Sequence, residues 1–166
     1  LSGRYHIQIA YKNNYTLLHE MYLYNSTINN DTSAYEYSLS DGKYLWRMRA
    51  EDKSFNWSGF TDYWVVKIDT QKPLGPSLYQ PANYSITTEM NVTFRWQNLS
   101  SSELSGIYQY EVWIGANILY IPGQNNSTTL SLSDGTYNWK VRAVDIVGNI
   151  GEFSETWTVT CLLYTS

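Results

Sequence analysis

The sequence predicts an all-β protein that contains two copies of one β-sandwich module. The stretch SLSDGKYLWRMRAED, residues 38–52, returns as SLSDGTYNWKVRAVD, residues 131–145, with ten of fifteen positions identical and an offset of 93 residues. That offset suits a small domain rather than a solenoid unit. Apolar and polar residues alternate with a period of two, and 16 Tyr and 7 Trp accompany only 16% charged residues. Both features are typical of β-sheets.

Seven strands are expected in the second copy, separated by turn signals such as Asp134-Gly135. They cover residues 77–80, 90–97, 107–115, 117–121, 127–133, 136–145 and 155–161. Short strands at this spacing indicate a sandwich of two sheets. The residues expected to face its core occupy alternate positions: Val92, Phe94, Trp96, Tyr108, Tyr110, Val112, Ile114, Tyr137, Trp139, Val141, Ala143 and Trp157.

The first copy repeats this pattern but begins later in the module. LSGRYHIQIAY, residues 1–11, resembles LSGIYQYEVWI, residues 104–114, with an offset of 103, so a loop of the first copy holds ten additional residues. The same period-two alternation predicts its inward row: Tyr5, Ile7, Ile9, Tyr11, Tyr44, Trp46, Met48, Ala50 and Trp64. His6, Arg47 and Arg49 are expected on the outward face, and His19 in the longer loop.

Nothing in the first copy corresponds to residues 73–103, which hold the first two strands of the second copy. A sandwich without them exposes inner aromatic residues and open strand edges. We therefore expect the chain to be a fragment cut upstream of Leu1. The alternative is that a neighbouring subunit donates the missing strands.

These boundaries give a domain plan. Residues 1–70 form an incomplete sandwich, residues 71–76 a linker and residues 77–161 a complete sandwich. The segment Asp69–Pro76 contains two prolines and a glycine, so it is expected to be a short, stiff hinge.

The last six residues, Cys161–Ser166, break the repeat and contain the single cysteine. Their sequence CLLYTS is the translation of TGT CTC TTA TAC ACA TCT, which resembles a transposase adapter of sequencing libraries. The hypothesis is that residues 161–166 are a non-native tail, and resequencing of the locus tests it.

The pattern L-x-D-G-x-Y-x-W-x-V-R-A-x-D, followed by an aromatic strand and an I-D-T-x-x-P linker, resembles fibronectin type III and related immunoglobulin-like modules. Such modules occur in bacterial and archaeal surface proteins, with archaea favoured here, and the resemblance covers essentially the whole chain. It implies two tandem sandwiches with Tyr44 and Tyr137 as tyrosine corners. It also implies that Trp96 is the buried tryptophan of the second strand, beside the core anchors Trp46 and Trp139.

Nine N-x-S/T sequons are present although the chain has only 14 asparagines. They are glycosylation candidates of an exported protein, and the alternative is a surface rich in Asn, Ser and Thr. The sequons begin at Asn14, Asn25, Asn30, Asn56, Asn83, Asn91, Asn98, Asn125 and Asn126. The last two overlap, so only one of them is expected to carry a glycan.

No pattern indicates catalysis. Asp52 and Asp145 close strands, where a carboxylate caps loop amides, and calcium between loops is an alternative without D-x-D-x-D-G support. The two histidines have no metal-ligand spacing, and no nucleophile elbow or carboxylate pair is indicated. We expect no enzyme activity and no cofactor. A net charge of −4 argues against nucleic acid binding, and no apolar run spans a membrane.

Trp57 and Trp113 are the tryptophans that core packing does not explain, since Trp57 falls in a loop and Trp113 on an outward face. With Tyr22 and Tyr24 they are candidates for ligand contact, and the alternative is glycan shielding or contact between modules. The predicted function is a structural or adhesion module of a larger cell-surface protein: a spacer, stalk, coat or fibre subunit. Its expected partners are neighbouring modules, surface glycans or other surface proteins. The alternative is a carbohydrate- or protein-binding accessory module of a secreted hydrolase.

Overall fold

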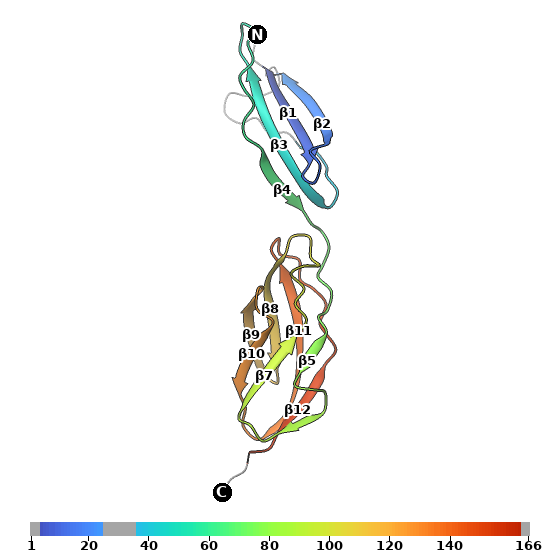
Figure 1. The fold of residues 1–166 in the computed structure, drawn as a ribbon, viewed down its shortest axis with the longest axis vertical. Coiled ribbons are helices and arrows are strands. Elements are labelled where there is room, and N and C mark those ends of the chain that lie inside the picture. The colour runs from blue at the N-terminus through green and yellow to red at the C-terminus, as the bar shows by residue number, and fades with distance from the viewer. Residues whose placement is uncertain (1–3, 25–35, 164–166) are drawn as a thin grey trace. The chain divides into compact units, whose positions relative to one another are not determined.

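The computed structural model describes residues 4–24 and 36–163, and within these ranges it confirms the all-β class. The chain divides into two compact units, Leu1–Asp69 and Thr70–Ser166 (Figure 1). The prediction that residues 161–166 are non-native stays a prediction, and its last three residues lie outside the described residues.

Unit 1 contains a four-stranded antiparallel sheet in the order β2-β1-β3-β4. Its strands are β1 (Arg4–Tyr11), β2 (Leu17–Tyr24), β3 (Gly42–Glu51) and β4 (Trp64–Ile68). His19 lies on β2 opposite Ile9, so its assignment to a loop was wrong.

Unit 2 is a sandwich of a three-stranded sheet, β10-β7-β5, and a five-stranded sheet, β6-β12-β11-β8-β9. All seven expected strands are present, and β6 is an eighth that the sequence pattern did not indicate. The bounds are β5 (Leu78–Gln80), β6 (Ser85–Thr87), β7 (Asn91–Trp96), β8 (Ile107–Ile114), β9 (Asn117–Pro122), β10 (Ser127–Ser131), β11 (Gly135–Asp145) and β12 (Trp157–Cys161).

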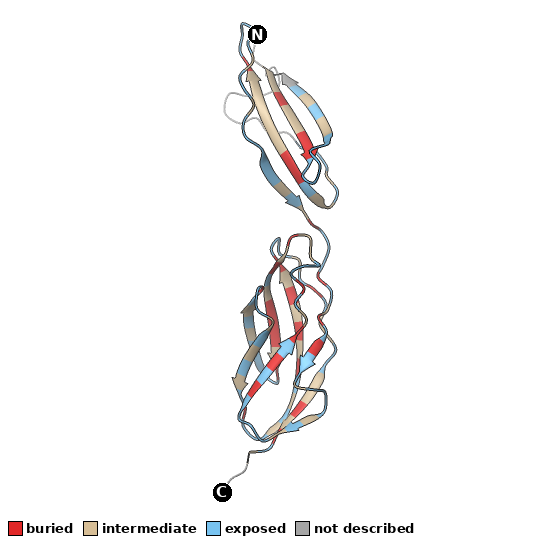
Figure 2. Ribbon diagram, viewed as in Figure 1, coloured by how far each residue is buried: buried red, intermediate tan, exposed pale blue. Residues whose placement is uncertain are grey.

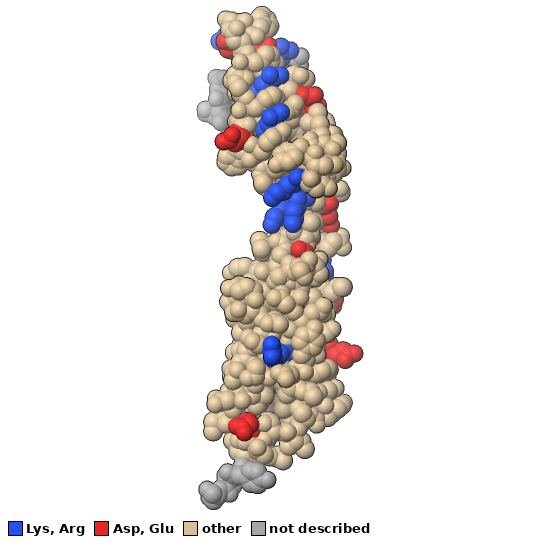
Figure 3. Space-filling view, viewed as in Figure 1, with Lys and Arg blue, Asp and Glu red and all other residues tan. Residues whose placement is uncertain are grey.

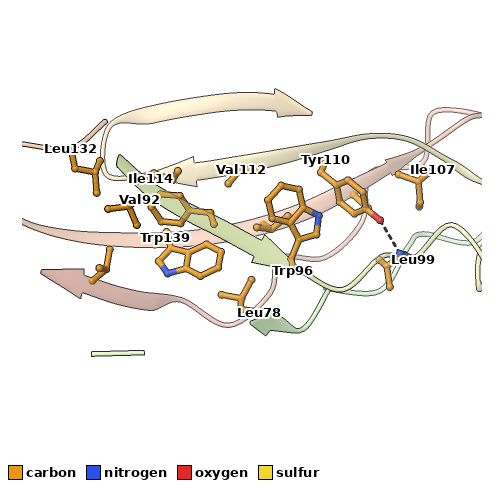
Figure 4. Close-up of a cluster of buried hydrophobic side chains, with 14 of the residues drawn as sticks. Leu78, Val92, Trp96, Leu99, Ile107, Tyr110, Val112, Ile114, Leu132 and Trp139 are labelled. Atoms are coloured by element: carbon orange, nitrogen blue, oxygen red, sulfur yellow. Dashed lines mark hydrogen bonds between the residues drawn. The ribbon is translucent and has the colours of Figure 1, made fainter. Parts of the chain in front are cut away.

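The core of unit 2 lies between these sheets (Figures 2 and 4). Phe94 meets Trp139 edge to face with ring centroids 5.1 Å apart, and Trp96 meets Tyr110 at 5.5 Å. The Tyr110 hydroxyl accepts a hydrogen bond from the Leu99 amide at 2.8 Å. Aromatic pairs of this geometry add specific contact energy to area burial, so β7 is joined to β8 and β11 through its inward aromatic residues.

The strand ladders revise the alignment between the two copies. Ala50 pairs with Tyr5, whereas the equivalent Ala143 pairs with Tyr110. Tyr5 therefore corresponds to Tyr110, an offset of 105 rather than 103. A register shift between Val144 and Asp145 leaves Tyr108 unpaired and accounts for one residue of this difference. Tyr108 consequently lies outside the core, 64% exposed, and its assignment to the inward row was wrong.

The corresponding inward face of unit 1 is less covered. Trp46 is equivalent to the fully buried Trp139, yet it is only half-buried, and its opposite neighbour Trp64 is 63% exposed. Core packing does not account for Trp64, contrary to expectation. Tyr11 on the same face is also exposed, because no described strand of unit 1 lies over this side of the sheet.

The predicted linker is shorter than its sequence indicated. Pro73 and Pro76 are buried, and the carbonyl of Pro73 accepts a hydrogen bond from the Glu152 amide at 3.2 Å. Gly75 packs so closely on the Phe153 backbone that a Cβ would lie 2.5 Å from its carbonyl oxygen. Residues 73–76 thus belong to unit 2. Cys161 ends β12 with its side chain fully buried.

Candidate functional site: aromatic and cationic ladders on the outer sheet faces

The outward face of the unit 1 sheet carries alternating arginines and aromatic rings. The guanidinium of Arg49 lies 4.6 Å from the ring centroids of both Trp57 and Phe60, and that of Arg47 lies 4.1 Å from Phe60 and 4.6 Å from Tyr63. The arginines come from β3, while the rings come from the segment between β3 and β4. Cation–π stacking therefore holds this segment against the sheet.

His6 lies on the outward face of β1, as predicted, but it is buried beneath this ladder, 2% exposed. The side chain points away from the inward row, and the segment that carries the ladder rings covers it. The imidazole stacks on Tyr22 at 4.4 Å, its Nδ1 accepts from Arg49 Nε at 3.0 Å, and its Nε2 contacts the Glu20 carboxylate. A buried polar ring is tolerated here because both nitrogens are bonded.

Unit 2 builds the same ladder with different residues. Phe153 takes the place of Phe60, with Lys140 Nζ 4.0 Å and the Arg142 guanidinium 4.7 Å from its ring centroid. Lys140 also lies 5.0 Å from the ring of Trp113. Arg142 donates to the Glu111 carboxylate at 2.8 Å. By strand register Glu111 occupies the position of His6, and Arg142 that of Arg49.

Backbone bonds fix both ladder segments to the strand beneath. In unit 1 the Ser58 amide donates to the Ala50 carbonyl at 2.8 Å, and the Ala50 amide donates to Ser58 Oγ at 3.0 Å. In unit 2 Ser154 makes the same reciprocal pair with Val141. The rings are therefore positioned by the extended backbone and not only by their own stacking.

A carboxylate caps the start of each ladder segment. Asp52 Oδ1 accepts the amides of Ser54 and Asn56 at 2.8 and 2.9 Å. Asp145 Oδ1 accepts the Asn149 amide at 2.8 Å, and Asn149 Nδ2 donates back to Asp145 Oδ2 at 2.7 Å. These amide bonds lower the pKa of the Asp52 carboxyl, the bond from the Asn56 amide most. Both aspartates thus act as caps of the loops that follow them.

Two further carboxylates of unit 1 are held ionised by bonds along the sheet. The hydrogen bonds from Arg4 lower the pKa of Glu51, and Arg4 Nη2 lies 2.5 Å from Glu51 Oε1. The bond from Gln8, followed by that from His6, lowers the pKa of Glu20. In the described residues no cluster of three potential metal ligands is found. The carboxylates instead pair with neighbouring strands.

Trp57 and Trp113, the candidate ligand-contact residues, lie inside the ladders. Trp57 packs edge-on to His6 and Tyr22 at centroid distances of 6.0 and 6.1 Å, and Trp113 packs edge-on to Phe153 at 5.2 Å. Both side chains are half-buried. The shallow cavity beside Trp113 has a volume of 190 Å³, below the range of typical ligand pockets. The Tyr24 side chain lies outside the described residues.

The candidate tyrosine corners have closely similar geometry. Tyr44 Oη donates to the carbonyl of Ser40 at 2.9 Å, and Tyr137 Oη donates to the carbonyl of Ser133 at 3.1 Å. Each bond spans four residues and ties the segment before the Asp-Gly turn to the strand after it. Tyr44 is 1% exposed and Tyr137 is half-buried.

The sequon asparagines fall into two groups, those whose side-chain Oδ1 accepts a hydrogen bond and those whose Nδ2 donates one. In Asn14 and Asn98 the Oδ1 accepts the amide of the sequon hydroxyl residue, Thr16 at 3.0 Å and Ser100 at 2.9 Å. Asn83 and Asn91 likewise use Oδ1, toward the Thr158 amide and the Ser131 hydroxyl. In contrast, Nδ2 donates in Asn56 to Asp52 and in Asn126 to the Trp96 carbonyl. Asn125 is exposed, and Asn25 and Asn30 lie outside the described residues.

The exposed surface of unit 2 carries few charges, and uncharged residues dominate the face shown in Figure 3. A hollow of 620 Å³ lies between the segment of Leu74 to Leu78 and the segment of Phe153 to Trp157. Within the described ranges, no helix has the length and apolar character that crossing a bilayer requires.

Comparisons with known proteins show only distant likeness. No known family matches the sequence, and no curated protein does. Among solved structures, the FN1–FN3 domains of chicken CNTN1 are 14% identical with a TM-score of 0.49, covering 96% of this chain and 54% of that chain. The fibronectin(III)-like modules of Clostridium thermocellum CbhA are 11% identical with a TM-score of 0.45, covering 95% and 78%. The chain thus spans about half of the CNTN1 structure, and the architecture rests on the strand pairing described above.

Proposed function

We propose that this chain is a non-catalytic structural module of a larger extracellular or cell-surface protein, where it acts as a spacer, stalk, coat or fibre element. The observation that carries the proposal is how both units use their charged side chains. Arg49, Arg142 and Lys140 stack in ladders, while Asp52 and Asp145 cap loops. In both units these charged side chains hold strands and loops together.

The strand pairing of unit 2 suits a chain under tension. The early strand β6 pairs in parallel with the last strand β12, in the register Val159–Ser85 to Cys161–Thr87. Hydrogen bonds from Tyr84 to Thr158 at 2.8 Å and from Leu162 to Thr87 at 2.9 Å extend the pairing at its two ends. A pull on the two chain ends slides parallel strands in opposite directions, so these bonds resist together instead of opening one by one.

Force spectroscopy of the 166-residue chain, held at its two ends, tests this proposal. Unit 2 should unfold in one step that releases roughly 80 residues, or about 280 Å of extended chain. Thr87→Pro, which removes a backbone donor from β6 and disturbs its pairing, should lower the unfolding force. Thr129→Pro on β10, in the other sheet, is the matched control. Gradual extension without a force peak would contradict the proposed role as a spacer or stalk under tension.

Glycan cover on exposed sequons fits the same role, because bulky sugars need a solvated attachment site. Expected partners are neighbouring modules of the same protein and surface glycans or proteins around it. The proposal includes no cofactor.

The second candidate function is a carbohydrate- or protein-binding accessory module of a secreted hydrolase. The 620 Å³ hollow favours it, because its volume lies in the range of ligand pockets and Leu74, Phe153 and Trp157 contribute apolar surface to its lining. A polysaccharide pull-down separates the two functions. Binding that is lost in Trp157→Ala, and retained in Trp113→Ala, would place the ligand in the hollow and favour this alternative.

A further inference from the structure

The inward face of the unit 1 sheet is built as one half of a sandwich core. By strand register Tyr5, Ile7 and Ile9 on β1 correspond to Tyr110, Val112 and Ile114 on β8. The three residues of unit 2 are fully buried, whereas Tyr5 and Ile7 are only half-buried. Similar side chains thus lie at equivalent positions of both sheets, but those of unit 1 are less buried.

The difference in burial between the two units is largest at the equivalent tryptophans. Trp139 is fully buried under Phe94, while the equivalent half-buried Trp46 meets the ring of Trp64 at a centroid distance of 6.0 Å, and Trp64 is itself 63% exposed. Exposed aromatic surface of this extent on a sheet face is unfavourable in water. Such a face indicates a surface that packs against a partner.

Unit 2 shows what covers such a face. The three-stranded sheet β10-β7-β5 lies over it, and within this sheet β5 and β7 form an antiparallel pair joined at Leu78–Trp96. On β7, Phe94 contacts Trp139 and Trp96 contacts Tyr110, two residues apart and therefore on one side of the strand. The polar residues Thr93 and Arg95 point away and are exposed. The aromatic part of the cover is thus the amphipathic strand β7, which has aromatic residues at alternate positions and pairs with β5.

We propose that the inward face of unit 1 binds an antiparallel strand pair with the chemistry of β5 and β7, which places one aromatic ring over Trp46 and another over Tyr5. The docking uses side-chain packing across a sandwich interface, so the strand pair lies over the sheet and does not extend its edge. The inference is independent of the proposed function, because it concerns how the first sandwich is completed and not what the chain does.

A fusion tests the proposal. Residues 73–103 in the second copy lead directly into Leu104-Ser105-Gly106, and the chain itself starts with the same three residue types. A copy of residues 73–103 is therefore placed ahead of Leu1. The control fusion has serine in place of the copied Phe94 and Trp96. Hydroxyl-radical footprinting with mass spectrometry then reads the oxidation of Trp46, Trp64 and Met48.

With the intact fusion, oxidation of Trp46 and Trp64 should fall at least threefold relative to the unfused chain, and the control fusion should leave it unchanged. Equal protection by both fusions, or no protection, would overturn the proposal. The same segment added as a free peptide provides a second measurement if the fusion folds poorly. It should protect Trp46 in a saturable manner, whereas the serine-substituted peptide should not.

The unfused chain also provides a test against a second copy of itself as the occupant. Sedimentation velocity between low and high micromolar concentration should show no association that protects Trp46. Concentration-dependent protection of Trp46 together with dimer formation would assign the face to a second copy and overturn the strand-pair proposal.

Discussion

Arg49 Nε donates a hydrogen bond to Nδ1 of His6 at 3.0 Å. Because a guanidinium nitrogen always carries its hydrogen, Nδ1 of His6 must be the unprotonated nitrogen. Nε2 therefore holds the proton and donates to the Glu20 carboxylate. The buried imidazole thus lies between a cation on its Nδ1 side and an anion on its Nε2 side, in the position where unit 2 has Glu111 paired with Arg142.

This relationship predicts a measurable coupling between His6 and Glu20. His6→Glu copies the unit 2 arrangement toward Arg49, but it places a second carboxylate beside Glu20, and like charges at this distance are unfavourable. We expect the substitution to destabilise unit 1, and Glu20→Gln in the same chain to relieve part of the loss. Denaturant unfolding of both single variants and the double variant should show a coupling free energy of about 0.5–3 kcal/mol. Strictly additive effects would contradict the contact.

The two equivalent tryptophans give a matched pair of stability predictions. Trp139→Ala should cost about 3–5 kcal/mol, because it empties a fully buried site under Phe94. Trp46→Ala should cost clearly less, since Trp46 is only half-buried. Unfolding of each variant by guanidinium, followed by hydrogen exchange of peptides from each unit, measures both. Equal losses would show that the face of unit 1 is as well covered as that of unit 2.

The sequence predicted the strands of unit 2 because alternation is strict there and both sheets are present. It did not predict β6, whose three residues make a parallel pairing with β12 across 74 positions of sequence. A short strand paired with so distant a partner leaves no local period, and neighbouring Asn and Ser residues resemble a loop.

The ladders were missed for a different reason. Arg47 and Arg49 were expected to face outward, and they do, but a polar residue at an outward position normally indicates exposure to solvent. The sequence gives no direct sign that the segment after the strand folds back over it. The signal that could have indicated the ladders is the spacing of the aromatic residues after the strand. In the first copy they recur every three positions, at Trp57, Phe60 and Tyr63, and the second copy has Phe153.

The depressed carboxylate pKa values predict that acid weakens unit 1. Glu20, Glu51 and Asp52 have folded-state pKa values below 4.5 for Glu and 3.8 for Asp. A depressed folded-state pKa adds stability above the unfolded-state value, and this contribution is lost as the pH falls through the folded-state value. Unit 1 should therefore become less resistant to denaturant below about pH 4.5. In Glu51→Gln this dependence on pH should be reduced, and an unchanged profile would contradict the pairing of Glu51 with Arg4.

The sequon geometry predicts which asparagines tolerate a glycan in the folded chain. Glycosylation replaces one of the two hydrogens on Nδ2 of asparagine by the sugar, so a bulky group is attached to this nitrogen. In Asn14 and Asn98 the Oδ1 makes the local bond and Nδ2 has no described partner, whereas in Asn56 and Asn126 the Nδ2 donates to Asp52 and to the Trp96 carbonyl. Attachment at the second pair places the sugar on a nitrogen that already donates to Asp52 or to the Trp96 carbonyl, and so disturbs a bond that caps a loop or ties β7 to the turn before β10.

Expression in an N-glycosylating host, followed by glycopeptide mass spectrometry, measures this order. Asn14 and Asn98 should be occupied to a higher fraction than Asn56 and Asn126, and of the overlapping pair Asn125 should carry the sugar. Asn126→Asp should destabilise unit 2 by about 1 kcal/mol, as for loss of a side-chain hydrogen bond to backbone, whereas Asn125→Asp should be neutral. Preferential occupancy of Asn126 would mean that the turn holding it opens before transfer, and would contradict the order drawn from the folded chain.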